Sequence, residues 1–308
     1  MKEIDGTKYL TIAKYCNATI RESNMRAIDV HVHVPREPGR PDFRIEAGVR
    51  RMFRMNQPPP DPDGMADIYR SLDIFGVIFS VDAETSHGDS ADSNDYVAGI
   101  VEAHPDVFMG FATVDPWKRD GAVDELERAI KDLGLRGLKL HPIHQAFFPD
   151  DSRMRALFEK CSELAVPVIM HSGYGAAGAG EPGGLGLKLK YARPIPHFDD
   201  LAASHPDLTI IMAHPAWPWV EEQIAVALHK PNVFIDLSGW APRYIPNQLI
   251  HEANTRLRDK IMFGSDYPYI HPERWLSEFE QLEIREHVRP KILLENARRV
   301  LKIERTCD

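Results

Sequence analysis

The sequence predicts an α/β fold of the (β/α)8, or TIM-barrel, class. Eight short runs of apolar and β-branched residues alternate with helical patterns from residue 26 onward. The runs are almost continuously apolar, which is typical of parallel strands buried on both faces. Similar helix-to-strand connections recur at 104–107, 205–208 and 230–233, where a proline stops the helix and Asp or Asn forms the turn. An open, doubly wound sheet is the alternative, but eight strands in one chain favour the barrel.

The predicted elements follow one another in a regular βα order. The eight expected strands are 27–34, 77–82, 108–115, 136–141, 166–172, 208–214, 232–238 and 260–266. Amphipathic segments with apolar residues at i, i+3 and i+4 lie between them, for example 122–133, 152–164 and 221–230. We therefore expect one domain over 1–308, with the barrel at about 26–302 and an N-terminal extension at 1–25.

Composition excludes several classes of protein. The 308 residues carry a net charge of −9, so we expect no nucleic-acid partner and no membrane partner. No apolar run approaches the roughly 18 residues that span a bilayer, and the first residues lack the apolar core of a signal peptide. Cys16, Cys161 and Cys307 are too few and too scattered for a disulfide framework, which favours a cytoplasmic location.

Two connections are too long to be plain turns. The segment 35–64 carries six arginines, and we expect Arg50, Arg51 and Arg54 to bind an anionic group of a substrate. A solvated loop whose arginines pair with surface acids is the alternative. The segment after His171 is glycine-rich and contains a GxGxxG match at 173–178, but no helical pattern follows to hold a pyrophosphate. We interpret it as a flexible active-site loop.

The ends of the predicted strands carry residues that can do chemistry, and in a barrel these ends form the active site. His31 and His33 are two residues apart on one strand, so both point to the same face. Two unpartnered buried imidazoles are costly, whereas two neutral imidazoles on one ion are satisfied. With His171 and Asp266 they form a set of three nitrogens and one carboxylate that suits a divalent metal. The alternative for Asp266 is a helix N-cap.

Other residues at strand ends admit two interpretations. His214 is either a core histidine or a catalytic residue that polarises the substrate. Lys139 lies on the same strand face as His141, and we expect it to pair with Asp115 or with a substrate anion. A carboxylated Lys139 that bridges a second metal is the other possibility. Trp217 and Trp240 suit a substrate pocket or a homodimer interface.

With these residues in place, the chain resembles the amidohydrolase superfamily. The segments IDVHVHV, RGLKLHP, PVIMHSG, IIMAHP, NVFIDLSGW and FGSDYP occur in the order of its amidohydrolase-2 branch, which includes aminocarboxymuconate-semialdehyde decarboxylase. The runs LKLKYARP, HPAWPW and ALHKPNVFIDLSGWAP look closest to the 4-hydroxyphenyl-β-ketoacyl-CoA hydrolases. The resemblance implies that His31, His33, His171 and Asp266 bind one metal and that His214 is catalytic.

The expected function is that of a metal-dependent hydrolase. A metal-bound water would attack a carbonyl of a small organic acid or an aromatic-catabolic β-ketoacyl substrate, either anionic or a CoA thioester. Asp266 would take the proton of the water. The donor set favours Zn²⁺, with Mn²⁺ or Fe²⁺ as alternatives. Non-oxidative decarboxylation of an aromatic or muconate-type carboxylate is the second hypothesis, and a catalytically silent metal-binding barrel is the third. Some decarboxylases of the branch have glutamate in place of the first histidine, so His31 favours hydrolysis.

Overall fold

A computed structural model describes residues 25–303 and confirms the barrel. The strands, all parallel to their neighbours, form a three-stranded sheet and a six-stranded sheet. They are β1 (Ala27–His33), β2 (Ile74–Phe79), β3 (Phe108–Gly110), β4 (Ala112–Thr113), β5 (Leu138–Leu140), β6 (Val168–His171), β7 (Ile210–Ala213), β8 (Val233–Asp236) and β9 (Ile261–Met262).

Backbone hydrogen bonds join the two sheets into one ring. β3 and β4 are one strand interrupted at Phe111, whose N–H donates to the carbonyl of Ile78 at 2.9 Å. On the other side, the N–H of Val30 in β1 donates to the carbonyl of Phe263 after β9 at 3.0 Å. Eight strands therefore close around a common axis, as the sequence predicts.

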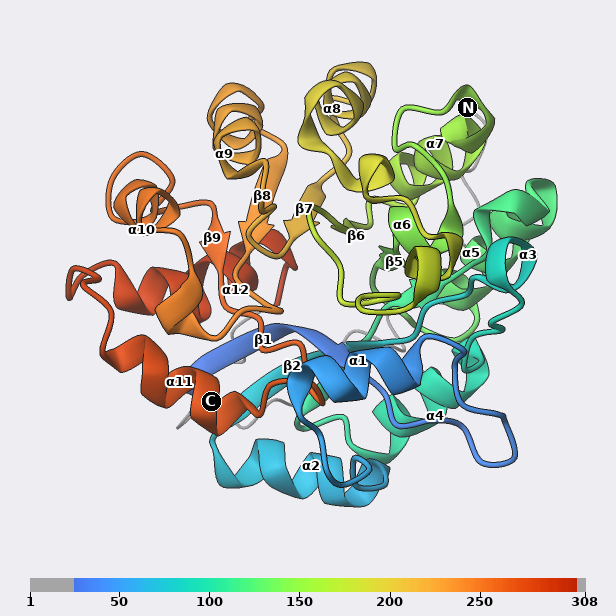
Figure 1. The fold of residues 1–308 in the computed structure, drawn as a ribbon, viewed down its shortest axis with the longest axis horizontal. Helices are drawn as coiled ribbons and strands as arrows, with labels where there is room; N and C mark the ends of the chain where they lie inside the picture. The colour runs from blue at the N-terminus through green and yellow to red at the C-terminus, as the bar shows by residue number, and fades with distance from the viewer. Residues whose placement is uncertain (1–24, 304–308) are drawn as a thin grey trace, which may run out of the picture.

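Helices surround the strands (Figure 1). The longer ones are α1 (Glu46–Phe53), α2 (Pro62–Ser71), α4 (Asn94–Ala103), α5 (Asp120–Lys131), α7 (Arg155–Glu163), α8 (Asp199–Ser204), α9 (Val220–His229), α10 (Asn247–Ala253), α11 (Pro272–Glu280) and α12 (Asn296–Val300). The single-turn helices α3 (Glu84–His87) and α6 (Pro142–Gln145) follow β2 and β5. None of the helices among residues 25–303 is long and apolar enough to cross a membrane.

Seven of the eight predicted strands are shorter in the structure, and the second is displaced along the chain. The second strand begins at Ile74 rather than at residue 77, because Asp73 adopts a left-handed conformation (φ 52°) and ends the turn after α2. The connection 35–64 is not merely a loop, since it contains α1 and the start of α2. The glycine-rich segment forms only short 3-10 turns at Pro182–Gly186 and Leu189–Ala192, so no helix follows the GxGxxG match. The N-terminal residues 1–24, with Cys16, and Cys307 lie outside the described residues.

Side chains of the strands alternate between two cores. Outward residues such as Leu138 and Leu140 pack under the helices in the larger core. Inward residues such as Ile169 and Ile211 form a second apolar cluster inside the barrel, where Val300 at the end of α12 joins them. The interior of the barrel is thus filled at its amino-terminal end, and polar groups are confined to the carboxyl ends of the strands.

Candidate active site

A cavity of about 850 Å³ opens at the carboxyl ends of the strands. Its polar lining includes the four histidines and the one aspartate that the sequence assigns to metal binding and catalysis. Lys139 and two histidines after β5 also line it. These residues are His31, His33, His171, His214, Asp266, Lys139, His141 and His144. Its walls are largely apolar and aromatic, and include Phe43, Val49, Phe53, Trp217, Trp240, Tyr269 and Ile270.

A β-bulge in β1 directs the first two histidines into the cavity. Between Asp29 and Val32 the register with β2 shifts, so that three steps along β1 match two steps along β2. Ile28, before the shift, and Val30, within it, belong to the inner apolar cluster, whereas Val32 belongs to the outer core. The extra residue reverses the alternation and turns His31 and His33 inward.

Four other polar residues reach the cavity end of the barrel by regular alternation. Leu138 and Leu140 face the helices, so Lys139 and His141 face inward, as predicted. His171 ends β6 and Asp236 ends β8, and both side chains are buried. The rings of His141 and His171 stack with centroids 4.0 Å apart.

His214 and Asp266 reach the cavity through left-handed backbone. Their φ angles are 70° and 69°, values that side-chain-bearing residues rarely adopt and that cluster at functional sites. The segment carrying Asp266 runs beside β1, because the N–H of Asp266 donates to the carbonyl of His31 at 3.0 Å. This pairing brings the carboxylate next to the two histidines of β1.

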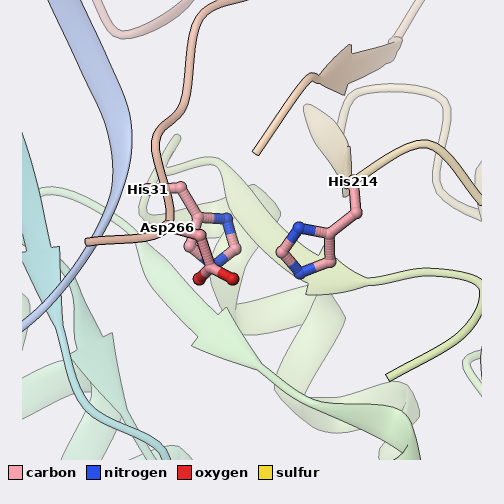
Figure 2. A group of neighbouring side chains, drawn as sticks. All are labelled: His31, His214 and Asp266. Carbon is pink, nitrogen blue, oxygen red and sulfur yellow. The ribbon is translucent and has the colours of Figure 1, made fainter. Parts of the chain in front are cut away.

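The acid and histidine side chains converge at this point. Asp266 Oδ1 lies 3.4 Å from His31 Nε2 and 3.3 Å from His33 Nε2. Among residues 25–303, potential ligand atoms of His31, His214 and Asp266 also lie within 4.8 Å of one another. Figure 2 shows the imidazole of His214 facing the Asp266 carboxylate and the His31 ring. This group includes His214 but neither His33 nor His171, the other two residues that the sequence predicts to be ligands.

The donor set fits a divalent ion. His171 Nε2 is buried and has no hydrogen-bond partner within the described chain, which an ion would remedy. Burial lowers the pKa of His31, of His171 and of His214, so the imidazoles stay neutral, as metal ligands must be. Burial alone would raise the pKa of Asp266, but the hydrogen bond from His33 and the nearby imidazoles hold it well below its usual value.

Lys139 makes a contact that the sequence did not predict. Its Nζ lies 2.9 Å from His31 Nε2 and 4.6 Å from the centre of the Phe79 ring. Asp115, the expected partner, instead accepts hydrogen bonds from the backbone N–H groups of Thr85 and Trp117. The pairing of Lys139 with Asp115 is therefore wrong. Burial lowers the pKa of Lys139 to about 8, against the opposing charges of nearby acids.

The predicted substrate-binding residues divide into two groups. Arg54, Trp217 and Trp240 line the cavity. Arg50 pairs within α1 with Glu46 at 2.8 Å, and Arg51 pairs with Glu181 of the glycine-rich segment. These two pairings match the alternative in which loop arginines bind protein acids.

Sequence reasoning gave no role to several residues of the site. Asp236 lies within the predicted strand 232–238, and its Oδ2 is 3.1 Å from His31 Nδ1. Ser238 ends the same predicted strand, and its hydroxyl lies 2.8 Å from His214 Nδ1. Arg243 and Arg274 on the cavity wall were also missed. The run NVFIDLSGW contains Asp236 and Ser238 two positions apart, which is the signal that could have paired them.

Comparisons with known proteins agree with this fold. A family model described as amidohydrolase matches residues 28–303. The gamma-resorcylate decarboxylase of Rhodococcus jostii (strain RHA1) is 26% identical over 253 residues, covering 69% of this chain and 76% of that protein. An uncharacterized TIM-barrel protein from Bordetella bronchiseptica has 28% sequence identity and a TM-score of 0.75, covering 90% of this chain and 98% of that chain.

A third protein shares the fold. It is a dihydroxybenzoic acid decarboxylase from Polaromonas sp. JS666, whose crystal structure holds manganese and the inhibitor 2-nitroresorcinol. Its TM-score is 0.62 at 20% identity, and the match covers 91% of this chain and 98% of that chain.

Proposed function

The chain belongs to the amidohydrolase-2 branch of the amidohydrolase superfamily, and from this we propose that it is a metal-dependent, non-oxidative decarboxylase of a hydroxylated aromatic carboxylate. The observation that carries the proposal is the cavity, whose His and Asp cluster lies beneath apolar and aromatic walls. A flat aromatic ring fits such walls, and a carboxylate fits the cationic metal site. The names of the relatives support decarboxylation more than the hydrolysis that the sequence favoured.

We assign the metal to His31, His33, His171 and Asp266. When bound, the ion would orient the substrate carboxylate and stabilise negative charge that develops on the substrate. Zn²⁺ suits the nitrogen-rich donor set, and Mn²⁺ is the second metal to test because the Polaromonas enzyme holds it. The metal content of His214→Asn decides whether His214 is also a ligand.

The protein's own groups must then move one proton. In decarboxylation the bond from the ring carbon to CO2 breaks, its electron pair stays with the ring, and one proton forms the new C–H bond. The pKa of Asp266 is held so low that its carboxylate stays ionised and holds the metal. Burial lowers the pKa of His214 beside it, so His214 stays neutral and can deliver a proton only after taking one from the substrate or from water.

The aromatic wall and Arg54 would position the substrate. The rings of Trp217 and Trp240 lie 6.5 Å apart on the wall, and Phe53 stacks on Tyr269 with centroids 5.3 Å apart. These surfaces would exclude water from around the aromatic ring of the substrate, with the substrate carboxylate facing the metal cluster.

Hydrolysis is the second candidate. The ionised Asp266 carboxylate among neutral imidazoles is also the arrangement that takes a proton from a metal-activated water. The β-ketoacyl-CoA substrates implied by the sequence motifs belong to this candidate and stay a prediction. A homodimer and a cytoplasmic location likewise stay predictions.

The test compares two products. Protein loaded with Zn²⁺ or Mn²⁺ is incubated with 2,6-dihydroxybenzoate in D2O, and we expect CO2 release together with one deuterium on the ring. A β-ketoacyl thioester is incubated in ¹⁸O-labelled water in parallel, where hydrolysis would place the label in the acid product. Label in the acid with no CO2 from any hydroxybenzoate would contradict the proposal and favour hydrolysis. His31→Ala serves as the metal-deficient control.

A further inference from the structure

One buried carboxylate contacts both a proposed metal ligand and the proposed catalytic histidine. Asp236 is fully buried at the end of β8. Its Oδ2 lies 3.1 Å from His31 Nδ1, on the side of that ring away from Asp266. Its Oδ1 accepts hydrogen bonds from the backbone N–H groups of Ser238 at 2.9 Å and His214 at 3.2 Å.

The hydrogen bonds of His31 define where its proton lies. The ammonium of Lys139 can only donate, so His31 Nε2, 2.9 Å away, is the acceptor. In a neutral imidazole the other nitrogen then carries the proton, and His31 Nδ1–H donates to Asp236. Two independent contacts thus agree that Nε2 holds the free electron pair.

The same reasoning applies to His214 through Ser238. The hydroxyl of Ser238 contacts Asp236 Oδ1 very closely and lies 2.8 Å from His214 Nδ1. The Ser238 hydroxyl has only one proton to donate. That proton must lie between Ser238 and the Asp236 carboxylate, because without it the two oxygens would repel each other at so short a distance. The Ser238 oxygen therefore accepts from His214 Nδ1–H, and His214 Nε2 is left unprotonated.

The ring of His214 is also fixed in place. Gly239 lies against it with φ +71°, and a Cβ there would come within 2.6 Å of His214 Nδ1. Gln223 Nε2 donates to the carbonyl of His214 at 2.7 Å. A ring held in this way does not turn over to exchange its two nitrogens.

We propose that Asp236 and Ser238 are positioning residues that fix the Nδ1–H tautomer of both His31 and His214, so that each presents an unprotonated Nε2 to the cavity. For His31 this is the form that can ligate a metal. For His214 it means that turnover begins with a proton acceptor, which must take a proton from the substrate or from water before it can donate one. The tautomers rest on the hydrogen bonds alone, and only the consequence for turnover rests on the proposed function.

The test measures tautomers and metal binding separately. Protein with ¹⁵N-labelled histidine and bound Zn²⁺ is studied by NMR, with the His214 signals identified by their loss in His214→Asn. We expect wild-type His214 to be protonated at Nδ1, and Ser238→Ala to shift it toward the Nε2–H form. Ser238→Ala should keep its zinc affinity, whereas Asp236→Asn should bind zinc about 10–100-fold more weakly.

A matched control removes the same kind of bond elsewhere. Ser80 is a buried serine whose hydroxyl donates to Asp92 at 3.0 Å and not to a group of the metal cluster. Ser80→Ala should change neither the His214 signals nor the zinc affinity. Wild-type His214 protonated at Nε2, or unchanged His214 signals in Ser238→Ala, would overturn the inference even if Asp236→Asn does not fold. If NMR shows the expected tautomers but the protein has no decarboxylase activity, only the proposed function is contradicted.

Discussion

Replacing Lys139 by methionine should tighten metal binding, although it removes a polar residue from the site. His31 Nε2 cannot accept a hydrogen bond from Lys139 and bind a metal at the same time, so this 2.9 Å hydrogen bond must open before metal can bind. Methionine has a similar length, carries no charge and leaves Nε2 available. The substitution therefore removes a competitor and a nearby positive charge.

The hydrogen bond sets the magnitude. A bond that involves a charged group contributes about 1.5–3 kcal/mol. At about 1.4 kcal/mol per tenfold change, its loss predicts zinc binding roughly 10–100-fold tighter in Lys139→Met. Repulsion between the ammonium and the ion acts in the same direction.

The assay is a competition titration of zinc against a chelator, with isothermal calorimetry as a second measurement. The matched control is Lys260→Met, because Lys260, just before β9, is a partly buried lysine whose ammonium donates to the backbone carbonyls of Ala227, Lys230 and Val233. Its loss should leave zinc affinity unchanged. Weaker zinc binding in Lys139→Met would refute the competition and would favour the carboxylated lysine that bridges a second metal.

Three further variants test the site. Asp266→Asn should retain part of the zinc on the three histidines while turnover falls by roughly 10²–10⁴-fold, and near-native turnover would remove Asp266 from the mechanism. Arg54→Ala should raise KM for an anionic substrate by about two- to fivefold, the contribution of an exposed ion pair, whereas Arg44→Ala, off the cavity wall, should not. Gly239→Ala should keep its metal but lose roughly 10²-fold in kcat, because its Cβ would displace the His214 ring. An unchanged kcat in that variant would mean that the ring tolerates the displacement.

The strand ends could be predicted wherever the strands are regular. Lys139, His141, His171 and Asp236 occupy inward positions of β5, β6 and β8, and simple alternation places them there. The two-residue spacing of His31 and His33 predicts that they lie on the same face of β1. Whether that face points into the barrel or toward the helices depends on the bulge in β1. Nothing local in the sequence marks that bulge, because it arises from pairing with β2, more than 40 residues away.

The remaining parts of the site depend on contacts between distant segments. His214 follows Ala213, an inward residue of β7, so regular alternation would point it outward, and only its left-handed backbone turns it into the cavity. Its link to His31 passes through Ser238 and Asp236 on another strand. Lys139 is a further example, since its partner His31 lies 108 residues away rather than at the expected Asp115. Residue type and strand position identify the candidates, and tertiary pairing decides what they contact.

The irregular backbone at the β1 bulge and at His214 is stabilised in the same way, by a buried carboxylate that accepts hydrogen bonds from its amides. At the bulge, Asp29 Oδ1 accepts from the N–H of His31 at 3.2 Å and from the N–H of Ser265 at 2.8 Å. At the other segment, Asp236 Oδ1 accepts from the N–H of His214 at 3.2 Å.

These carboxylates satisfy amides that regular strand pairing would otherwise have satisfied. Burial raises the pKa of Asp29 to about 7, while Ser265, His31 and Tyr69 donate to it and oppose the rise. Such buried acids are unfavourable on their own, and the hydrogen bonds that offset the cost also hold the backbone of His31 and of His214. Asp29 and Asp236 therefore connect the irregular backbone to the chemistry of the site. Removing either carboxylate would leave backbone N–H groups without a hydrogen-bond acceptor and would at the same time displace His31 or His214.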